Sequence, residues 1–297
     1  MAEADRLDFR EGVIVLRVFV VGTPRSGTTV LQRLVAAHPR ITTFPESHFF
    51  DHLCRGGPWR RFLRLARRER ARDGLLQFLE RIGEAGRRSR RVEAIRSWRY
   101  GPWIRLFTGI LDDLARERGA DGWIEKTPIH LHHLATIARH VEGARVLHIL
   151  RSGEEVVASL RRVTRAHPEG WGGERTVEEC TTRWLLDVEL HGRWLGRRNH
   201  LFVLYDDLVD DSGSVVSHVL DFLQLPGAGV DALEGQAPPD GMIGPDEPWK
   251  EGAARPVSRE ERTDPDQVLS VEERRYVRER TDEVDLSVFR AGGRAAG

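Results

Sequence analysis

The sequence has few cysteines, and its charges cancel. Cys54 and Cys180 lie far apart and match no metal-ligand spacing, which argues against a disulfide scaffold and favours a reducing compartment. Lysine and arginine together number 46, as do aspartate and glutamate, so no global field favours nucleic acid or a membrane surface as a partner. We therefore expect neither partner, and any anion site must be local.

Long hydrophobic runs are also absent. The longest apolar stretch, residues 13–21, is interrupted by Arg17 and is too short to span a bilayer. The amino terminus is charged and lacks the basic-then-apolar pattern of a secretory signal. We therefore expect a soluble, cytoplasmic protein with one domain over residues 1–297.

Lysine is almost missing, which singles out the two that remain. Of 46 basic residues only Lys126 and Lys250 are lysines. A coding bias explains the arginine excess, and most surface salt bridges accept either residue. Chemistry that needs a compact point charge with movable hydrogen-bond donors does not accept the exchange so easily. Both lysines are therefore candidate functional residues, with chance as the alternative explanation.

Short apolar runs alternate with helical patterns along the chain. Strands are predicted over residues 18–21, 41–44, 145–150 and 201–205, and helices over 28–37, 129–141, 154–162 and 176–197. This alternation predicts an α/β fold with a central parallel sheet flanked by helices. Functional groups are then expected at the carboxyl ends of the strands.

Two segments depart from this alternation. Residues 51–122 are rich in arginine and helical in pattern, and we interpret them as an insertion or cap. The arginines of this insertion either cover solvated helix faces or meet an acidic acceptor in a pocket lined by Trp59, Trp98 and Trp103. Residues 227–260 are rich in Gly, Pro and Asp, which is typical of a lid.

The segment from Gly22 to Thr29 reads GTPRSGTT and lies between a buried strand and a helix. Its glycine spacing matches the nucleotide phosphate loop GxxxxGK[ST], except that Thr28 replaces the lysine. Unpaired N–H groups at a helix start favour an anion, but loss of the lysine disfavours nucleotide hydrolysis. The predicted phosphate contacts are Thr23, Pro24, Arg25, Ser26, Gly27, Thr28 and Thr29.

Two motifs together resemble the sulfotransferases that use 3′-phosphoadenosine 5′-phosphosulfate (PAPS), especially the tyrosylprotein-type and bacterial branches. GTPRSGTTVLQRLVAAHP is similar to their 5′-phosphosulfate loop. RVLHILRSGEEVVASLRR is similar to their 3′-phosphate motif, in which an arginine after a strand is followed eight residues later by a serine. With EKTP and LYDDL, the resemblance covers roughly a third of the chain and implies a P-loop-like sulfotransferase fold.

The resemblance also implies an activity. A sulfuryl group would move from PAPS to a hydroxyl, less readily an amine, of a small molecule, glycan or peptide acceptor. The other product would be adenosine 3′,5′-bisphosphate (PAP), and no metal is expected. Two other classes compete: a nucleotide kinase or NTPase using Asp206 or Asp207 for Mg²⁺, and a non-catalytic nucleotide-binding module.

Catalytic roles follow from the same resemblance. Glu46 is the predicted base, with His48 as the competing base, and on a strand the two side chains would point to one side. Lys126 is predicted to contact the sulfuryl and bridging oxygens, while Glu125 could form a structural pair with it. His130, His132 and His133 suggest a metal site, but we prefer an ordinary helix surface.

Nucleotide contacts complete the prediction. Arg151 and Ser159 are predicted to bind the 3′-phosphate, and Tyr205 to reach the nucleotide. In the lid, Trp249 would stack on adenine while Lys250 and Arg255 close over the phosphates.

Overall fold

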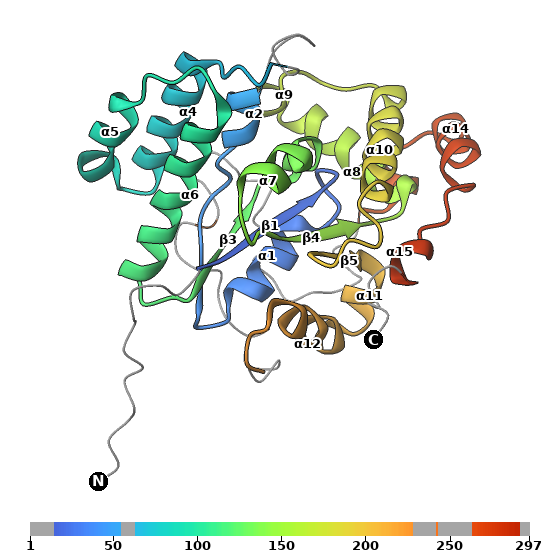
Figure 1. The fold of residues 1–297 in the computed structure, drawn as a ribbon. Coiled ribbons are helices and arrows are strands. Elements are labelled where there is room, and N and C mark those ends of the chain that lie inside the picture. The colour runs from blue at the N-terminus through green and yellow to red at the C-terminus, as the bar shows by residue number, and fades with distance from the viewer. Residues whose placement is uncertain (1–14, 55–62, 228–241, 243–262, 292–297) are drawn as a thin grey trace.

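The computed structural model describes residues 15–54, 63–227, 242 and 263–291. Five strands form one parallel sheet in the order β2-β3-β1-β4-β5 (Figure 1). The strands are β1 (Leu16–Gly22), β2 (Ile41–Thr43), β3 (Gly122–Lys126), β4 (Arg145–Leu150) and β5 (His200–Leu204). The predicted α/β fold with a central parallel sheet is confirmed.

Helices cover both faces of this sheet, so its strands read as nearly continuous apolar runs. In β1, Phe19 and Val21 pack against α2, α4 and α6, whereas Val18 and Val20 pack against α1 and α12. These helices are α1 (Thr28–Ala36), α2 (Phe49–Cys54), α4 (Arg68–Arg81), α6 (Tyr100–Glu117) and α12 (Ser212–Leu223). Two hydrophobic cores therefore hold the central strand.

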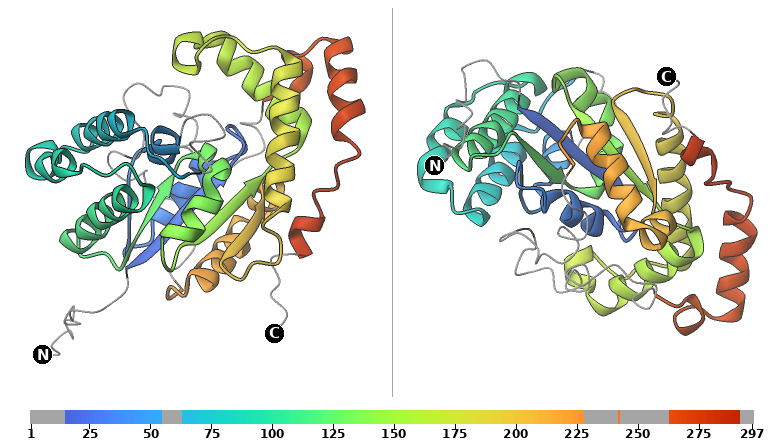
Figure 2. Two further views of the ribbon diagram at one scale, coloured as in Figure 1. Left: turned by 45° about the horizontal axis from the view of Figure 1, so that its top comes forward. Right: turned by 90° about the horizontal axis from the view of Figure 1, so that it is seen from below.

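The arginine-rich segment forms a helical layer beside the sheet. Helices α2, α4, α5 (Ala85–Ala94) and α6 lie between β2 and β3 in the chain and stand together in Figure 2. Beyond β4, three helices pack against one another: α8 (Gly153–Ala166), α10 (Val177–Gly192) and α14 (Val271–Thr281). None of the described helices combines the length and apolar composition that crossing a bilayer requires.

Three predicted elements differ in detail. The predicted helix 129–141 is a 3-10 helix, η1 (Pro128–His133), followed by α7 (Leu134–His140). Tyr205 begins α11 (Tyr205–Asp210) and does not end β5. Strand β2 stops at Thr43, because Pro45 has no N–H to donate to a ladder, so Glu46 and His48 lie in a loop. Short helices α9 (Pro168–Trp171), η3 (Pro265–Gln267) and α15 (Val288–Ala291) complete the list.

The strand order creates a crevice at the carboxyl end of the sheet. From β1 the chain crosses to β2 on one side of the sheet, whereas from β4 it crosses to β5 on the other side. The loops that leave β1 and β4 therefore diverge, and in such sheets ligands bind where this happens. The loop Gly22–Thr29, Lys126, Arg151 and Tyr205 all follow or end strands at this edge.

Candidate active site

The loop after β1 has the geometry of an anion site. The Ser26 N–H donates to Thr23 O at 3.1 Å, and its hydroxyl donates to Ile149 O of β4 at 3.2 Å. Helix α1 begins at Thr28 with no side-chain cap, so its first N–H groups lack intrahelical partners and favour an anion.

Gly27 is required by this geometry. Its φ is 101°, in the left-handed region, and a Cβ there would lie 2.4 Å from the Tyr205 ring. The loop backbone therefore packs directly on the tyrosine that follows β5, and any side chain at position 27 would separate them. Thr23 and Thr28, also predicted as phosphate contacts, are buried in this loop.

Arg25 and Ser159 were predicted from separate motifs, and the structure brings them together. The Arg25 Nε donates to the Ser159 hydroxyl of α8 at 3.1 Å. Burial, together with the positive charges of Arg162 and Arg151, lowers the pKa of Arg25 to about 10. Positive charge is thus concentrated here, which is the environment that a bound phosphate would relieve.

Arg151 lies directly after β4 and is buried. One terminal nitrogen donates to Glu155 Oε1 at 2.9 Å, and its guanidinium carbon lies 4.3 Å from the centre of the Tyr205 ring. A cation at the start of a helix is unfavourable unless an anion lies nearby, and Glu155 supplies part of that compensation. Its Nε is buried without a hydrogen-bond partner in the described part of the chain, so one donor is available to a ligand.

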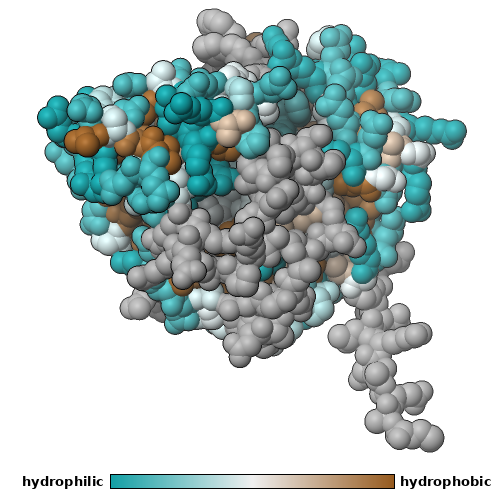
Figure 3. Space-filling model, turned by 180° about the vertical axis from the view of Figure 1, so that it is seen from behind, coloured by the Kyte–Doolittle hydropathy of each residue, from teal (hydrophilic) through white to brown (hydrophobic). Residues whose placement is uncertain are grey.

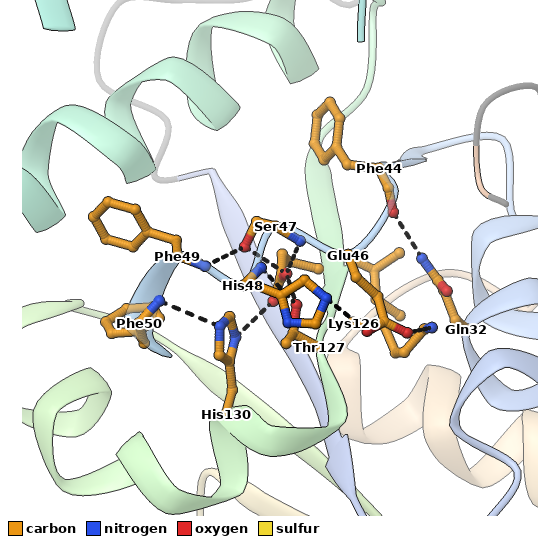
Figure 4. Close-up of polar contacts among 12 residues, drawn as sticks. Gln32, Phe44, Glu46, Ser47, His48, Phe49, Phe50, Lys126, Thr127 and His130 are labelled. Atoms are coloured by element: carbon orange, nitrogen blue, oxygen red, sulfur yellow. Dashed lines mark hydrogen bonds and ion pairs between the residues drawn. The ribbon is translucent and has the colours of Figure 1, made fainter. Parts of the chain in front are cut away.

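The predicted catalytic residues meet at the end of β3 (Figure 4). Lys126 Nζ lies 2.5 Å from Glu46 Oε1, and both side chains are buried, with exposures of 1% and 9%. His48 Nε2 lies 3.3 Å from the other Glu46 oxygen, and its side chain is 39% exposed. Glu46 therefore lies between a lysine and a histidine, so it is neither a helix cap nor an ordinary surface carboxylate.

Glu125 does not pair with Lys126, because consecutive residues of a strand point to opposite faces. Its carboxylate accepts hydrogen bonds from the Ser47 hydroxyl at 2.8 Å and the Thr127 hydroxyl at 2.6 Å, and it meets His130 Nδ1 at 2.9 Å. Burial alone would raise the pKa of Glu125, yet the His130 imidazole and these hydrogen bonds hold it below its usual range. Our sequence reasoning missed Ser47 and Thr127.

The three histidines after β3 do not form the ordinary helix surface that we preferred, because His130 and His133 are buried. His130 contacts Glu125, whereas His132 Nε2 lies 2.7 Å from Asp187 Oδ1 of α10. Within the residues that the structure describes, no group of three or more His, Cys, Asp or Glu side chains is placed to hold a metal ion.

The cap tryptophans divide between core and surface. Trp103 is fully buried in the hydrophobic core, whereas Trp98 is exposed and lies under Arg68 at 4.7 Å. Arg91 pairs with Asp113 at 2.8 Å on exposed helix faces, as expected for solvated helices, whereas Arg88, which pairs with Glu117 at 2.7 Å, is buried. Trp59 lies outside the described residues. The described back face is mainly hydrophilic, with small separate apolar patches (Figure 3).

A basic cavity borders the cap. It has a volume of about 320 Å³ and lies between α2, α6 and the η1–α7 segment. Its lining is Cys54, Arg64, Tyr100, His132, His133, Ala135, Thr136, Arg139 and His140. Burial lowers the pKa of His140, and Arg139, Arg64 and Arg105 lower it further. Neither Trp98 nor Trp103 lines this cavity.

The predicted lid residues and the alternative magnesium ligands remain to be placed. Trp249, Lys250 and Arg255, with most of the predicted lid, lie outside the described residues. The alternative magnesium ligand Asp207 accepts hydrogen bonds from Arg290, including one from Nε at 2.8 Å. That carboxylate is therefore already used in a surface ion pair.

The fold and the site together define a class: P-loop-like α/β proteins whose loop lacks the usual lysine and whose crevice is lined by cations from β3 and β4. A sequence model of the Sulfotransferase family matches residues 17–228, and the chain belongs to this family. The resemblance seen in the loop and the 3′-phosphate motif is thereby confirmed.

Curated relatives carry the same name at low identity. Protein-tyrosine sulfotransferase A of Caenorhabditis elegans is 23% identical over 214 residues, which are 70% of this chain and 50% of the relative. Protein-tyrosine sulfotransferase 2 of Gallus gallus is 22% identical over 229 residues, 76% of this chain and 55% of the relative. The chain thus spans about half the length of these relatives.

Solved structures confirm the P-loop-like sulfotransferase fold. The sulfotransferase domain of the Synechococcus PCC 7002 olefin synthase has a TM-score of 0.53 and 20% identity, with 91% of this chain and 95% of that chain covered. A mouse sulfotransferase solved in complex with PAP has a TM-score of 0.52 and 13% identity, with 93% and 87% covered.

Proposed function

We propose that this protein transfers a sulfuryl group from PAPS to an acceptor hydroxyl and releases PAP. The observation that carries the proposal is the buried Lys126–Glu46 pair, with 2.5 Å between Nζ and Oε1. It lies at the end of β3, the strand that pairs with β1 next to the phosphate loop. A cation and a base beside an anion site are the groups that this transfer needs.

The nucleotide would be held at two places. Backbone N–H groups of the loop, with Ser26, Thr28 and Thr29, would bind the 5′-phosphosulfate. Arg151 and Ser159 would bind the 3′-phosphate, whose negative charge would meet the cations gathered around Arg25. The PAP complex of the mouse neighbour supports this choice of nucleotide.

In the proposed reaction an acceptor oxygen attacks the sulfur atom. A new S–O bond forms while the bond from sulfur to the bridging oxygen of the 5′-phosphate breaks. The acceptor proton passes to Glu46, and Lys126 stabilises the charge that develops on the leaving phosphate. Lys126 also keeps the Glu46 carboxylate ionised before the reaction, which is the form that a base requires.

The proposal defines the acceptor less specifically than the donor. A hydroxyl of a small molecule, glycan or peptide fits the reaction, with an amine as the second choice. The basic cavity beside the cap, which holds Arg64 and Arg139, favours acceptors with acidic or polar groups.

One experiment tests the function against its alternatives. The thermal midpoint is measured with PAP and with ATP-Mg²⁺, and PAPS is then incubated with a panel of phenols, glycans and peptides. We expect stabilisation by PAP and a sulfated product in mass spectrometry. Stabilisation by ATP-Mg²⁺ alone would support the kinase class, and PAP binding without any product would support a non-catalytic module.

A further inference from the structure

Two short segments face each other residue by residue in the site. Besides the contact of Glu46 with Lys126, the Ser47 N–H and hydroxyl donate to Glu125 Oε1 at 3.1 and 2.8 Å. The His48 N–H donates to the Thr127 hydroxyl at 3.3 Å. Residues 46–48 are thus each bonded to a residue of segment 125–127, about 80 positions away in the chain.

Glu125 is the centre of this arrangement. Its side chain is fully buried, and one oxygen accepts all three hydrogen bonds from Ser47 and Thr127. A buried carboxylate is tolerated only when such bonds replace its hydration. The Thr127 hydroxyl donates to Glu125 and so presents its lone pairs to the His48 N–H. Glu125 therefore orients Ser47 directly and His48 through the Thr127 hydroxyl, and both residues follow the predicted base.

The second oxygen of Glu125 connects the site to a helix. It lies 2.9 Å from His130 Nδ1, while the Phe50 N–H donates to His130 Nε2 at 3.3 Å. Because Nε2 accepts, the proton of the imidazole belongs on Nδ1, where it is donated to Glu125. The first turn of α2, which follows the 46–48 segment, is thereby fixed to β3.

We propose that Glu125 is a positioning residue, which holds Glu46 and His48 at fixed places relative to Lys126. The arrangement itself does not depend on the activity, whereas its catalytic consequence rests on the proposed function. Glutamine has the same shape but carries two N–H donors in place of one acceptor oxygen. In Glu125→Gln one donor would face either Ser47 or His130, and the 46–48 segment would move.

The rarity of lysine gives a test that needs no activity. Protein labelled with [¹³Cε]lysine has two lysine cross-peaks, from Lys126 and Lys250, and Lys126→Arg assigns them. We expect Glu125→Gln to move the Lys126 cross-peak in the direction that Glu46→Gln moves it. Asp187→Asn, which alters another fully buried carboxylate with an imidazole partner, is the matched control and should leave it in place.

Milder variants keep the test decisive if Glu125→Gln does not fold. Ser47→Ala and Thr127→Val each remove one hydroxyl of the network and should move the cross-peak less, in the same direction. A Lys126 cross-peak that stays at its wild-type position in every folded variant would overturn the proposal.

Turnover gives the second readout. A displacement of about 1 Å in a catalytic group can cost on the order of 100-fold in rate, so Glu125→Gln should lower kcat strongly and leave PAP affinity unchanged. In a Glu46→Gln background the same change should cost less than about threefold, because its effect acts through Glu46. Equal losses in both backgrounds would contradict positioning. Absence of sulfuryl transfer by the wild type would refute the proposed function alone, since the NMR comparison is unaffected.

Discussion

The two halves of the site balance their charges in different ways. We call the loop Gly22–Thr29 with Arg151 and Ser159 the donor half, and segments 46–48 and 125–127 the transfer half. In the transfer half, Lys126 is paired with Glu46, and Glu125 meets His130. In the donor half, burial and two neighbouring arginines lower the pKa of Arg25, so positive charge is in excess.

This difference predicts which half of the site determines nucleotide binding and which half determines the chemical step. Excess positive charge in the donor half favours an anionic ligand, which would complete the local balance. The carboxylates of the transfer half already have ion-pair or hydrogen-bond partners without any ligand, so its groups are held in position before the substrates arrive. Changes in the first half should therefore affect nucleotide affinity, and changes in the second should affect turnover.

The largest effect is expected from the base in the transfer half. Glu46→Gln keeps the shape of the side chain but removes its basicity, and we expect kcat to fall by roughly 10² to 10⁴ with PAP affinity little changed. His48→Ala is the matched control and should cost far less. Steady-state kinetics and PAP titration decide whether Glu46 or His48 is the base. An active Glu46→Gln variant with an inactive His48→Ala variant would make His48 the base.

A smaller effect is expected from Arg151 in the donor half. Arg151→Ala removes a charge-assisted fork, and we expect PAP affinity to fall by roughly 10- to 100-fold. Arg161→Ala, which removes an arginine of α8 that pairs with Glu174, should leave PAP affinity unchanged. Calorimetric titration measures both. Equal affinities in Arg151→Ala and wild type would show that the 3′-phosphate does not bind there.

The smallest effect concerns a third cluster, in which histidines have only one another as hydrogen-bond partners among the described residues. His148 Nδ1 lies 2.8 Å from His191 Nδ1, and His148 Nε2 lies 2.8 Å from His200 Nδ1. Burial lowers the pKa of His191 to about 4, although Asp187 opposes this. Burial, and then Arg197, lower the pKa of His200 to about 4. No carboxylate bonds to these rings among the described residues, and burial keeps them neutral, whereas the transfer half contains the Lys126–Glu46 ion pair.

The sign of the pH dependence follows from these pKa values. As the pH falls from 6.5 towards 4, the unfolded chain gains protons at these rings and the folded chain does not. The free energy of unfolding should therefore fall by roughly 1.5 kcal/mol per ring between pH 6.5 and 5. Urea unfolding at pH 6.5 and at pH 5 measures this fall in the free energy of unfolding. His191→Leu should reduce the fall, whereas His218→Gln, at an exposed histidine, should not.

Local patterns predicted the strands, the loop and the helix starts of the donor half, whereas the roles of Arg151 and Ser159 came from the family resemblance. The apolar runs, the glycine loop and the Arg151–Ser159 spacing lie within single strand–turn–helix units, where neighbouring residues determine the structure. The contact of Arg25 with Ser159 joins two such units, and their order in the sheet does not follow from either one alone.

The transfer half was predicted only in part. Glu46 and Lys126 came from the family resemblance, but the loop conformation at Glu46 and the partners of Glu125 did not. Ser47 and Thr127 carry no motif of their own, and their bonds join segments about 80 residues apart. The alternation of strand side chains could have excluded a Glu125–Lys126 pair, since it places the two on opposite faces.

The most direct measurement is a calorimetric comparison of PAP with adenosine 5′-monophosphate, which lacks the 3′-phosphate, in a chelator and without added metal. The account predicts that PAP binds at least about tenfold more tightly, because Arg151 and Ser159 contact only the second phosphate. Equal affinities, or binding that requires Mg²⁺, would contradict a donor half built for two separate phosphates.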